Sequence, residues 1–250
     1  TRFRIASISK MFTAAAVLQL IAARKLDFDT RVVDFLGLEG GSIPAEVIIY
    51  HLLTRTAGIA DWFDESGDWR ANWEALIRYH PIYLFRQDAD YLPLFLHQPP
   101  QTAVGSRHHY SGSSYILLGL VIAQASGQSG FNYIRQHIFR PLGMEATDFI
   151  ALDGVDPQVA EGYIPPDGDQ GWKKNIYSVT PIAAADGGAV STSADLVRFS
   201  QALRASASGK EPGILPQPLA QSMLTPQVAQ FDAPVRGYDW RYGYGVIFTL

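Results

Sequence analysis

The chain has 250 residues, a formal net charge of −4 and no cysteine. This length suffices for one large domain, or two closely packed ones, with a sizeable core. The lack of cysteine excludes thiol nucleophiles, disulfides and thiolate metal ligands, and the small negative charge gives no general attraction to nucleic acid or anionic membranes. The longest apolar runs, 11–23 and 115–125, are shorter than the roughly 18 residues needed to cross a bilayer.

A long helix is predicted over residues 7–24. Phe12 and Leu20 lie at helical spacing on one face, and Met11 and Val17 make the remaining surface apolar as well. A helix that is apolar nearly all round is a buried helix. This helix is therefore expected to pass through the core.

Shorter elements are predicted between residues 25 and 100. Residues 25–37 indicate a turn with a short extended or helical piece, and residues 44–58 indicate a short helix that ends at Gly58. Residues 61–100 are rich in aromatic side chains with weak periodicity, which favours short helices and loops.

The aromatic side chains allow two interpretations. They either pack a helical part of the molecule, since aromatic residues dominate cores, or some of them wall a substrate cleft. The candidates for a cleft wall are Trp62, Trp69 and Trp73, with Trp172 as a further candidate at its rim.

The second half of the chain predicts a helix over residues 113–126, with Gly127 past its end, and another over 130–140, followed by a turn-rich stretch from 145 to 188. A further helix is expected to begin at Thr192, with Asp195 three residues on as in a capping box. The final residues, "YGYGVIFTL", read as a strand.

Ser7 and Lys10 form a Ser-x-x-Lys pair at the start of the first predicted helix. Residues three apart on a helix share a face, and a helix N-terminus favours developing negative charge on a serine oxygen. Burial disfavours the ammonium form of a lysine, and a neutral amine beside a hydroxyl is a general base beside a nucleophile. The pattern on its own leaves a second interpretation open, in which Ser7 only caps the helix and Lys10 is solvated.

Four segments in order resemble the serine β-lactamase and penicillin-binding-protein superfamily, in its class C-like branch. The first is "FRIASISKMFTAAAV", which opens the predicted nucleophile helix. The others are "IIYHLLTRTAGI", the stretch that begins "VGSRHHYSGSSYILLGL", and "GGAVSTSADLVRFSQAL". The Ser-x-x-Lys motif is a mark of these enzymes, and the resemblance covers almost the whole chain.

The resemblance implies an α+β fold of the serine β-lactamase/transpeptidase type. The chain is then expected to be one catalytic unit, residues 1–250, truncated at both ends. It would be mostly helical, with most of the central antiparallel sheet outside it. Residues 31–180 would form a helical subdomain, and residues 1–30 and 181–250 would belong to the sheet-containing one.

The resemblance also implies roles for individual residues. Ser7 would be the acylated nucleophile, Lys10 its basic partner and Tyr110 the phenol that relays a proton to the leaving group. Without the resemblance, an ordinary aromatic residue at a helix start is the favoured interpretation of Tyr110. The expected geometry places the Tyr110 hydroxyl within a few ångströms of Ser7 Oγ and Lys10 Nζ, or one water away.

The sequence departs from the family pattern at three places. Gly112 stands where an asparagine is usual, which is expected to leave a gap beside Lys10 in the substrate cleft and to harm ester substrates less than β-lactams or peptides. Arg55 and Ala57 stand where histidine and serine are common. The last motif of the family, Lys-Thr-Gly or His-x-Gly on a strand, is absent from residues 1–250.

The predicted function is a serine hydrolase that acts through an acyl-enzyme on an ester, a peptide or other amide, or a β-lactam, with no metal or cofactor and no nucleic-acid partner. No G-x-S-x-G or phosphate-binding glycine loop occurs, and the six histidines have no metal-ligand spacing. The alternative is a non-hydrolytic penicillin-binding or sensing relative with the same fold. The resemblance further implies a periplasmic, secreted or membrane-anchored parent protein, and it leaves the oligomeric state open.

Overall fold

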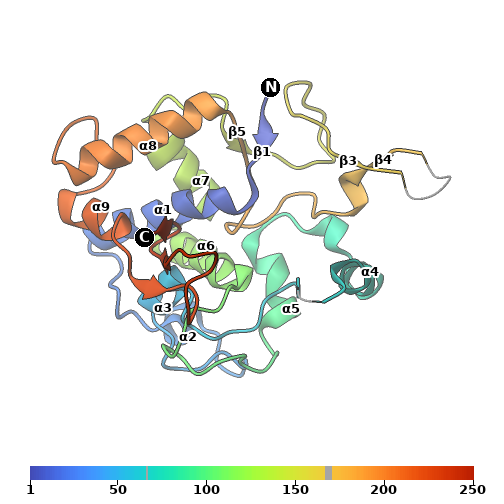
Figure 1. The fold of residues 1–250 in the computed structure, drawn as a ribbon, viewed down its shortest axis with the longest axis horizontal. Helices are drawn as coiled ribbons and strands as arrows, with labels where there is room; N and C mark the ends of the chain where they lie inside the picture. The colour runs from blue at the N-terminus through green and yellow to red at the C-terminus, as the bar shows by residue number, and fades with distance from the viewer. Residues whose placement is uncertain (66, 167–170) are drawn as a thin grey trace.

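Two apolar helices pack against each other at the centre of the molecule in the computed structural model, which describes residues 1–65, 67–166 and 171–250 (Figure 1). They are α1 (Lys10–Ala22) and α6 (Gly112–Ser126). Side chains from all around both helices are fully buried, among them Phe12, Val17, Leu18, Ile116, Leu117, Val121 and Ile122. The prediction of a buried N-terminal helix is confirmed, because an all-apolar surface is covered on every side.

Shorter helices surround this pair. On α6 lie α2 (Val32–Leu36) and α3 (Ile49–Thr54), and α6 also packs on the 3-10 helix η3 (Asp88–Tyr91). On α1 lie α7 (Gly130–Ile134), which continues into a π-helical turn (η4, Arg135–Phe139), and α9 (Gln217–Met223), which packs in turn on α8 (Ser193–Ala207). The remaining helical elements are α4 (Trp69–Tyr79), η2 (Ile82–Leu84), α5 (Leu92–Phe95) and η5 (Asn175–Tyr177).

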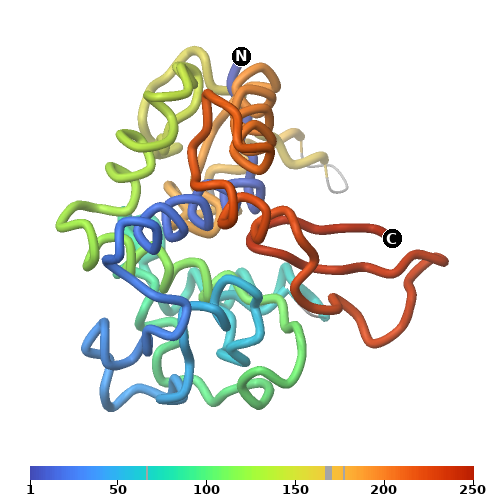
Figure 2. Tube along the Cα trace, turned by 90° about the vertical axis from the view of Figure 1, so that its left-hand side faces the viewer, coloured from blue at the N-terminus to red at the C-terminus, as the bar shows by residue number. Residues whose placement is uncertain are grey.

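The strands within the described residues are short and antiparallel. One sheet has the order β1 (Phe3–Arg4), β5 (Ala189–Ser191), β2 (Asp148–Phe149), with Phe3 opposite Ser191. Another pairs β3 (Tyr163–Ile164) with β4 (Lys173–Lys174). The third has the order β6 (Val228–Ala229), β7 (Trp240–Tyr242), β8 (Ile247–Thr249) and reaches out from the body of the molecule (Figure 2). The α+β prediction, helix-rich with few strands, is confirmed.

Two predicted helix boundaries can be compared with the structure. The first helix begins near Ser7 as predicted, but its first turn is the 3-10 helix η1 (Ala6–Ser9) that leads into α1. α3 ends at Thr54, before Gly58, because Arg55 takes the left-handed conformation, with φ of 57°, that closes its last turn.

Two predictions near the C-terminus are corrected as well. Thr192 caps α8 by accepting from the Asp195 amide at 3.3 Å, but the Asp195 carboxylate binds the Ala146 amide and the Thr147 hydroxyl, so only half of the capping box forms. The final stretch is a hairpin, because the chain turns between Gly243 and Val246 and only the residues after this turn form β8.

None of the helices within the described parts of the chain combines the length and the hydrophobicity that a transmembrane span requires. The division into a helical subdomain and a sheet-containing subdomain stays a prediction.

Loss of the Phe199 ring is expected to destabilise the core strongly. Phe199 is fully buried on α8 and meets the Phe12 ring edge-on at 4.9 Å. Phe199→Ala should lower the free energy of unfolding by about 3–5 kcal/mol, measured by urea denaturation. Val197→Ala on the same helix is the control, since Val197 is half exposed and should change stability by less than about 0.5 kcal/mol.

Candidate active site

Ser7 is presented to solvent on the 3-10 turn that leads into α1. The residue before it, Ala6, has a φ of 44°, a left-handed conformation that costs a non-glycine residue about 1–2 kcal/mol. The strand pairing of β1 with β5 continues into the turn, where the Ile5 amide donates to the Ala189 carbonyl at 3.1 Å and the Ala189 amide donates to Ser9 Oγ at 3.1 Å. The sheet and the helix therefore hold the turn from both sides.

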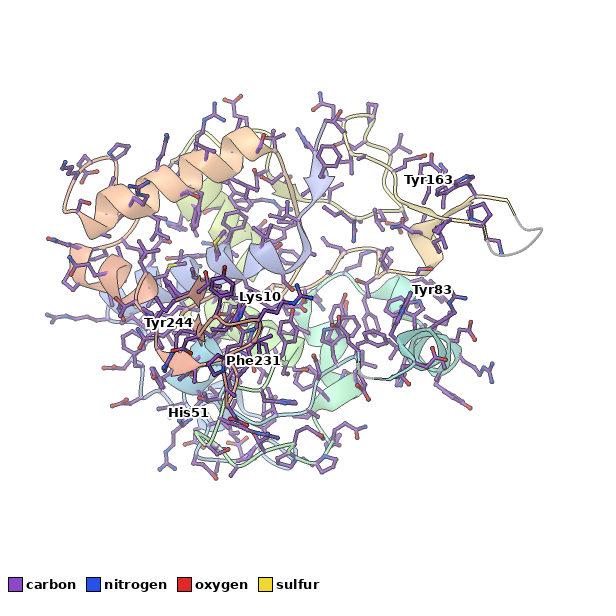
Figure 3. All side chains as sticks on the ribbon, viewed as in Figure 1. Lys10, His51, Tyr83, Tyr163, Phe231 and Tyr244 are labelled. Atoms are coloured by element: carbon purple, nitrogen blue, oxygen red, sulfur yellow. The ribbon has the colours of Figure 1, made fainter. Side chains whose placement is uncertain are left out.

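Lys10 is buried at the centre of the molecule, and only 1% of its surface is exposed (Figure 3). Its Nζ donates to Ser7 Oγ at 3.0 Å and to the main-chain carbonyl of Asp186 at 2.5 Å. The Asp186 carboxylate lies 3.8 Å from Nζ. The solvated alternative for Lys10 is therefore excluded, and the amine points at the serine.

Tyr110 completes the cluster from the other central helix. Its hydroxyl lies 2.7 Å from Ser7 Oγ, across 103 residues of sequence. Tyr110 directly precedes Ser111, the N-cap of α6, and its side chain remains 42% exposed. The packing of α6 on α1 brings this phenol to the serine, so the three residues lie together as the order of the motifs predicts.

The Arg55 guanidinium stacks on the ring of Tyr110. This arginine is only 3% exposed, and its guanidinium carbon lies 3.9 Å from the centre of the Tyr110 ring, 4.6 Å from the Tyr242 ring and 5.5 Å from the Tyr115 ring. A guanidinium stacked on an aromatic face is attracted by about 0.5–2 kcal/mol. The departure from the family pattern at position 55 thus places a buried cation against the phenol.

The turn between β7 and β8 closes over the start of α1. Gly245 in this turn has a φ of 76°, and a Cβ there would lie 3.0 Å from the Lys10 carbonyl group. Only glycine allows this close approach. The approach brings β7 to α6, where the Tyr242 hydroxyl donates to the Tyr115 hydroxyl at 3.3 Å.

Gly112 does not leave a gap beside Lys10, so that prediction is wrong. A Cβ on Gly112 would lie 2.6 Å from Asp186 Oδ2 and 2.8 Å from Trp62 Nε1. The volume is filled because the Trp62 indole donates to Asp186 Oδ2 at 3.3 Å, directly over residue 112. A side chain at position 112 would have to displace the Asp186 carboxylate or the Trp62 indole, which come from two other segments and already occupy the space.

The geometry equips Ser7 for acyl transfer. A nucleophile needs a base within hydrogen-bond reach, and Lys10 Nζ lies at that distance. A leaving group needs a proton donor on its side of the reacting carbon, and the Tyr110 hydroxyl is in contact with the same oxygen.

A family model described as Beta-lactamase matches residues 1–249. The chain belongs to the β-lactamase family. Penicillin-binding protein 4 of Amycolatopsis lactamdurans is 28% identical over 80% of this chain and 50% of its own length. Esterase EstB of Burkholderia gladioli is 28% identical over 98% of this chain and 66% of its own.

A solved structure gives the same assignment. A penicillin-binding protein from Bacillus halodurans superposes with a TM-score of 0.86 at 38% identity, over 100% of this chain and 71% of the other. This β-lactamase-family chain spans about half to two thirds of the length of the two curated relatives.

The tryptophans of this β-lactamase-family chain divide between the two interpretations. Trp62 lies beside the cluster through Asp186 and also lines a pocket with Phe63, Leu76 and other residues of the aromatic stretch. Trp73 is buried against the Phe63 ring and belongs to the core. Trp69 and Trp172 are exposed, and the described contacts around Ser7 include neither of them.

Two carboxyl groups that interact with Asp186, those of Asp61 and Asp88, were not predicted. Asp61 accepts from the Gly112 amide at 2.9 Å at the start of α6, and burial raises the pKa of Asp61 to about 6. Asp88 accepts from the Ala185 amide at 2.7 Å, and burial raises the pKa of Asp88 to about 7. Neither acid lies in a recognisable motif, so the sequence held no signal for them.

Among the described residues, no group of three or more histidine, aspartate or glutamate side chains is placed to hold a metal ion.

Asp88 is expected to make the free energy of unfolding depend on pH. Its pKa rises from 3.8 to about 7 on folding, so the folded state binds the proton more tightly, and its contribution to stability is lost as the pH rises from about 4 to 7. Asp88→Asn removes this titration, so the free energy of unfolding of the variant relative to the parent should increase by roughly 2–4 kcal/mol from pH 4 to pH 8.

Urea denaturation at several pH values measures this effect. Asp153→Asn is the matched control, because Asp153 is a half-exposed carboxylate paired with Arg86 on the surface. Parallel pH profiles for the parent and the Asp88→Asn protein would contradict the assignment.

Proposed function

We propose that this protein is a serine hydrolase that forms an acyl-enzyme on Ser7. The observation that carries the proposal is that the exposed Ser7 oxygen is hydrogen bonded to both Lys10 Nζ and the Tyr110 hydroxyl. The relatives support the reaction class, since their names include an esterase and penicillin-binding proteins.

The mechanism follows from this arrangement. The Lys10 amine accepts the Ser7 proton as Oγ attacks the carbonyl carbon, and the resulting alkoxide of the substrate lies near the main-chain N–H of Ser7. Tyr110 delivers its phenol proton to the leaving alcohol or amine as its bond to carbon breaks, and the proton held by Lys10 then restores the phenol. Water attacks the acyl carbon and gives one proton to the same groups, which return it to Ser7 Oγ as the bond between Oγ and the acyl carbon breaks and the carboxylic acid leaves.

The substrate class is an ester, a peptide or other amide, or a β-lactam. Simple esters fit the site best, because the Trp62 N–H is already donated to Asp186 and residue 112 has no side chain that could bind an amide of the substrate. Trp62 and Gly112 thus belong to the wall of the proposed site, whereas the exposed Trp172 has no assigned part.

A penicillin-binding relative that is acylated without release is the second candidate. The similarity to the Bacillus halodurans protein favours it. Ester turnover and mass spectrometry together distinguish the two candidates. A hydrolase releases product from a simple ester such as a p-nitrophenyl ester over many cycles, whereas a non-hydrolytic penicillin-binding protein gives no ester turnover and retains a penicilloyl adduct on Ser7.

The family resemblance further supports an exported parent protein. Cell fractionation tests this proposal, and recovery of the intact protein in the cytosol would contradict it.

Ser7→Ala is expected to abolish covalent labelling. A fluorophosphonate probe should add one adduct to the parent protein on the peptide that contains Ser7, because only an activated serine reacts with it. Ser200→Ala is the matched control, since Ser200 is an exposed serine on α8 whose hydroxyl donates to the Leu196 carbonyl of the same helix. Full labelling of the Ser7→Ala protein would show that another residue is the nucleophile.

Tyr110→Phe is expected to slow acylation by about 10²–10⁴-fold, the usual contribution of one general acid–base group. The fold should be unchanged, since only one partly exposed oxygen is lost. Stopped-flow acylation and circular dichroism check the two expectations, and Tyr79→Phe, at a more exposed tyrosine, is the control. Unchanged acylation would remove Tyr110 from the mechanism.

A further inference from the structure

The space beside Lys10 is occupied by a carboxylate that comes from a distant part of the chain. Asp186 lies 176 residues from Lys10, yet both its carbonyl oxygen and its carboxylate face the lysine. The carbonyl accepts from Nζ at 2.5 Å, and Oδ2 lies 3.8 Å from Nζ. The lysine is thus held between Ser7 and Asp186.

The main chain at Asp186 is bonded to the core through the preceding residue and is closed by a local turn on the following side. The preceding residue, Ala185, donates its amide to Asp88 at 2.7 Å and accepts from the Thr13 hydroxyl of α1 at 2.7 Å. The following amides of Gly187 and Gly188 donate to the Ala184 carbonyl at 3.1 and 3.0 Å. Asp186 therefore cannot follow Lys10 if the lysine moves, and it sets the position of the amine.

One of the two oxygens of the Asp186 carboxylate is left without a hydrogen bond within the described part of the chain. Its Oδ2 accepts from the Trp62 indole at 3.3 Å, whereas its Oδ1 is buried without a hydrogen-bond partner among the described residues. A buried carboxylate oxygen without a partner is destabilising, so its presence calls for a compensating role. A cation that forms next to it during the reaction supplies that role.

We propose that Asp186 is a positioning residue for Lys10, and that it stabilises the ammonium group as Lys10 takes the proton from Ser7. Position 112 is glycine for the same reason, because any side chain there would collide with the Asp186 carboxylate and the Trp62 indole that holds it. This inference rests on the proposed acylation of Ser7.

Asp186→Asn tests the charge while preserving the size and the acceptor for Trp62. With a fluorophosphonate probe at saturating concentrations, the limiting labelling rate should fall about 10- to 100-fold, as for a misplaced catalytic group. The half-saturating probe concentration should change by less than about threefold, because probe binding does not involve the carboxylate. A structural defect would instead reduce the labelled fraction and the melting temperature.

Asp195→Asn is the matched control for loss of a buried carboxylate. Asp195 is 2% exposed, but it binds Thr147 and Arg198 away from the cluster. This variant should lose stability and keep the parent labelling rate in its folded fraction.

Gly112→Ala provides a second test that does not depend on charge. The added methyl group would displace the carboxylate, so the limiting rate should fall in the parent background. It should fall much less in the Asp186→Ala background, where no carboxylate remains to be displaced.

The outcomes separate this inference from the proposed function. Loss of labelling in Ser7→Ala together with a labelling rate in Asp186→Asn within about twofold of the parent would overturn the role of Asp186 alone. Equal effects of Gly112→Ala in both backgrounds would also overturn it. Failure of the parent protein to label at Ser7 would instead overturn the proposed function itself.

Discussion

The burial of the Lys10 amine is the constraint on which the rest of the structure depends. An ammonium or amine group removed from water must find polar partners, and Lys10 finds Ser7 Oγ on the preceding 3-10 turn and the Asp186 carbonyl on a segment 176 residues away. Each partner must be held in place by its own neighbours. The sheet holds the turn that carries Ser7, and the core holds the segment that carries Asp186.

The packing of α1 on α6 brings the polar groups of the cluster together. Lys10 is the first residue of α1, Ser7 lies on the 3-10 turn η1 that leads into it, and α6 begins just after Tyr110. Because both helices are apolar all round, they pack along their length in the core, and their N-terminal ends meet at the serine. A polar cluster is thus positioned by apolar packing that touches none of its reacting atoms.

The departures from the family pattern are physically connected. Gly112 has no side chain because Asp186 and Trp62 occupy its space. Arg55 places its guanidinium against the face of the Tyr110 ring, whose hydroxyl contacts Ser7. Both departures therefore involve the Ser7, Lys10 and Tyr110 cluster: Gly112 makes room for the Asp186 carboxylate beside Lys10, and Arg55 stacks on Tyr110.

The sequence by itself determined the elements whose causes are local. The apolar surface of residues 10–22, the glycine after α6 and the Thr192 cap are properties of short segments, so the helices they specify could be predicted. The ordered motifs also carried Ser7, Lys10 and Tyr110, because their residue types are tied to chemistry. Only the tertiary structure decided what fills the space around them. Asp186, Trp62 and Arg55 reach the cluster across long stretches of chain, and no local pattern records that a glycine is needed because a distant carboxylate lies 2.6 Å from where its Cβ would be.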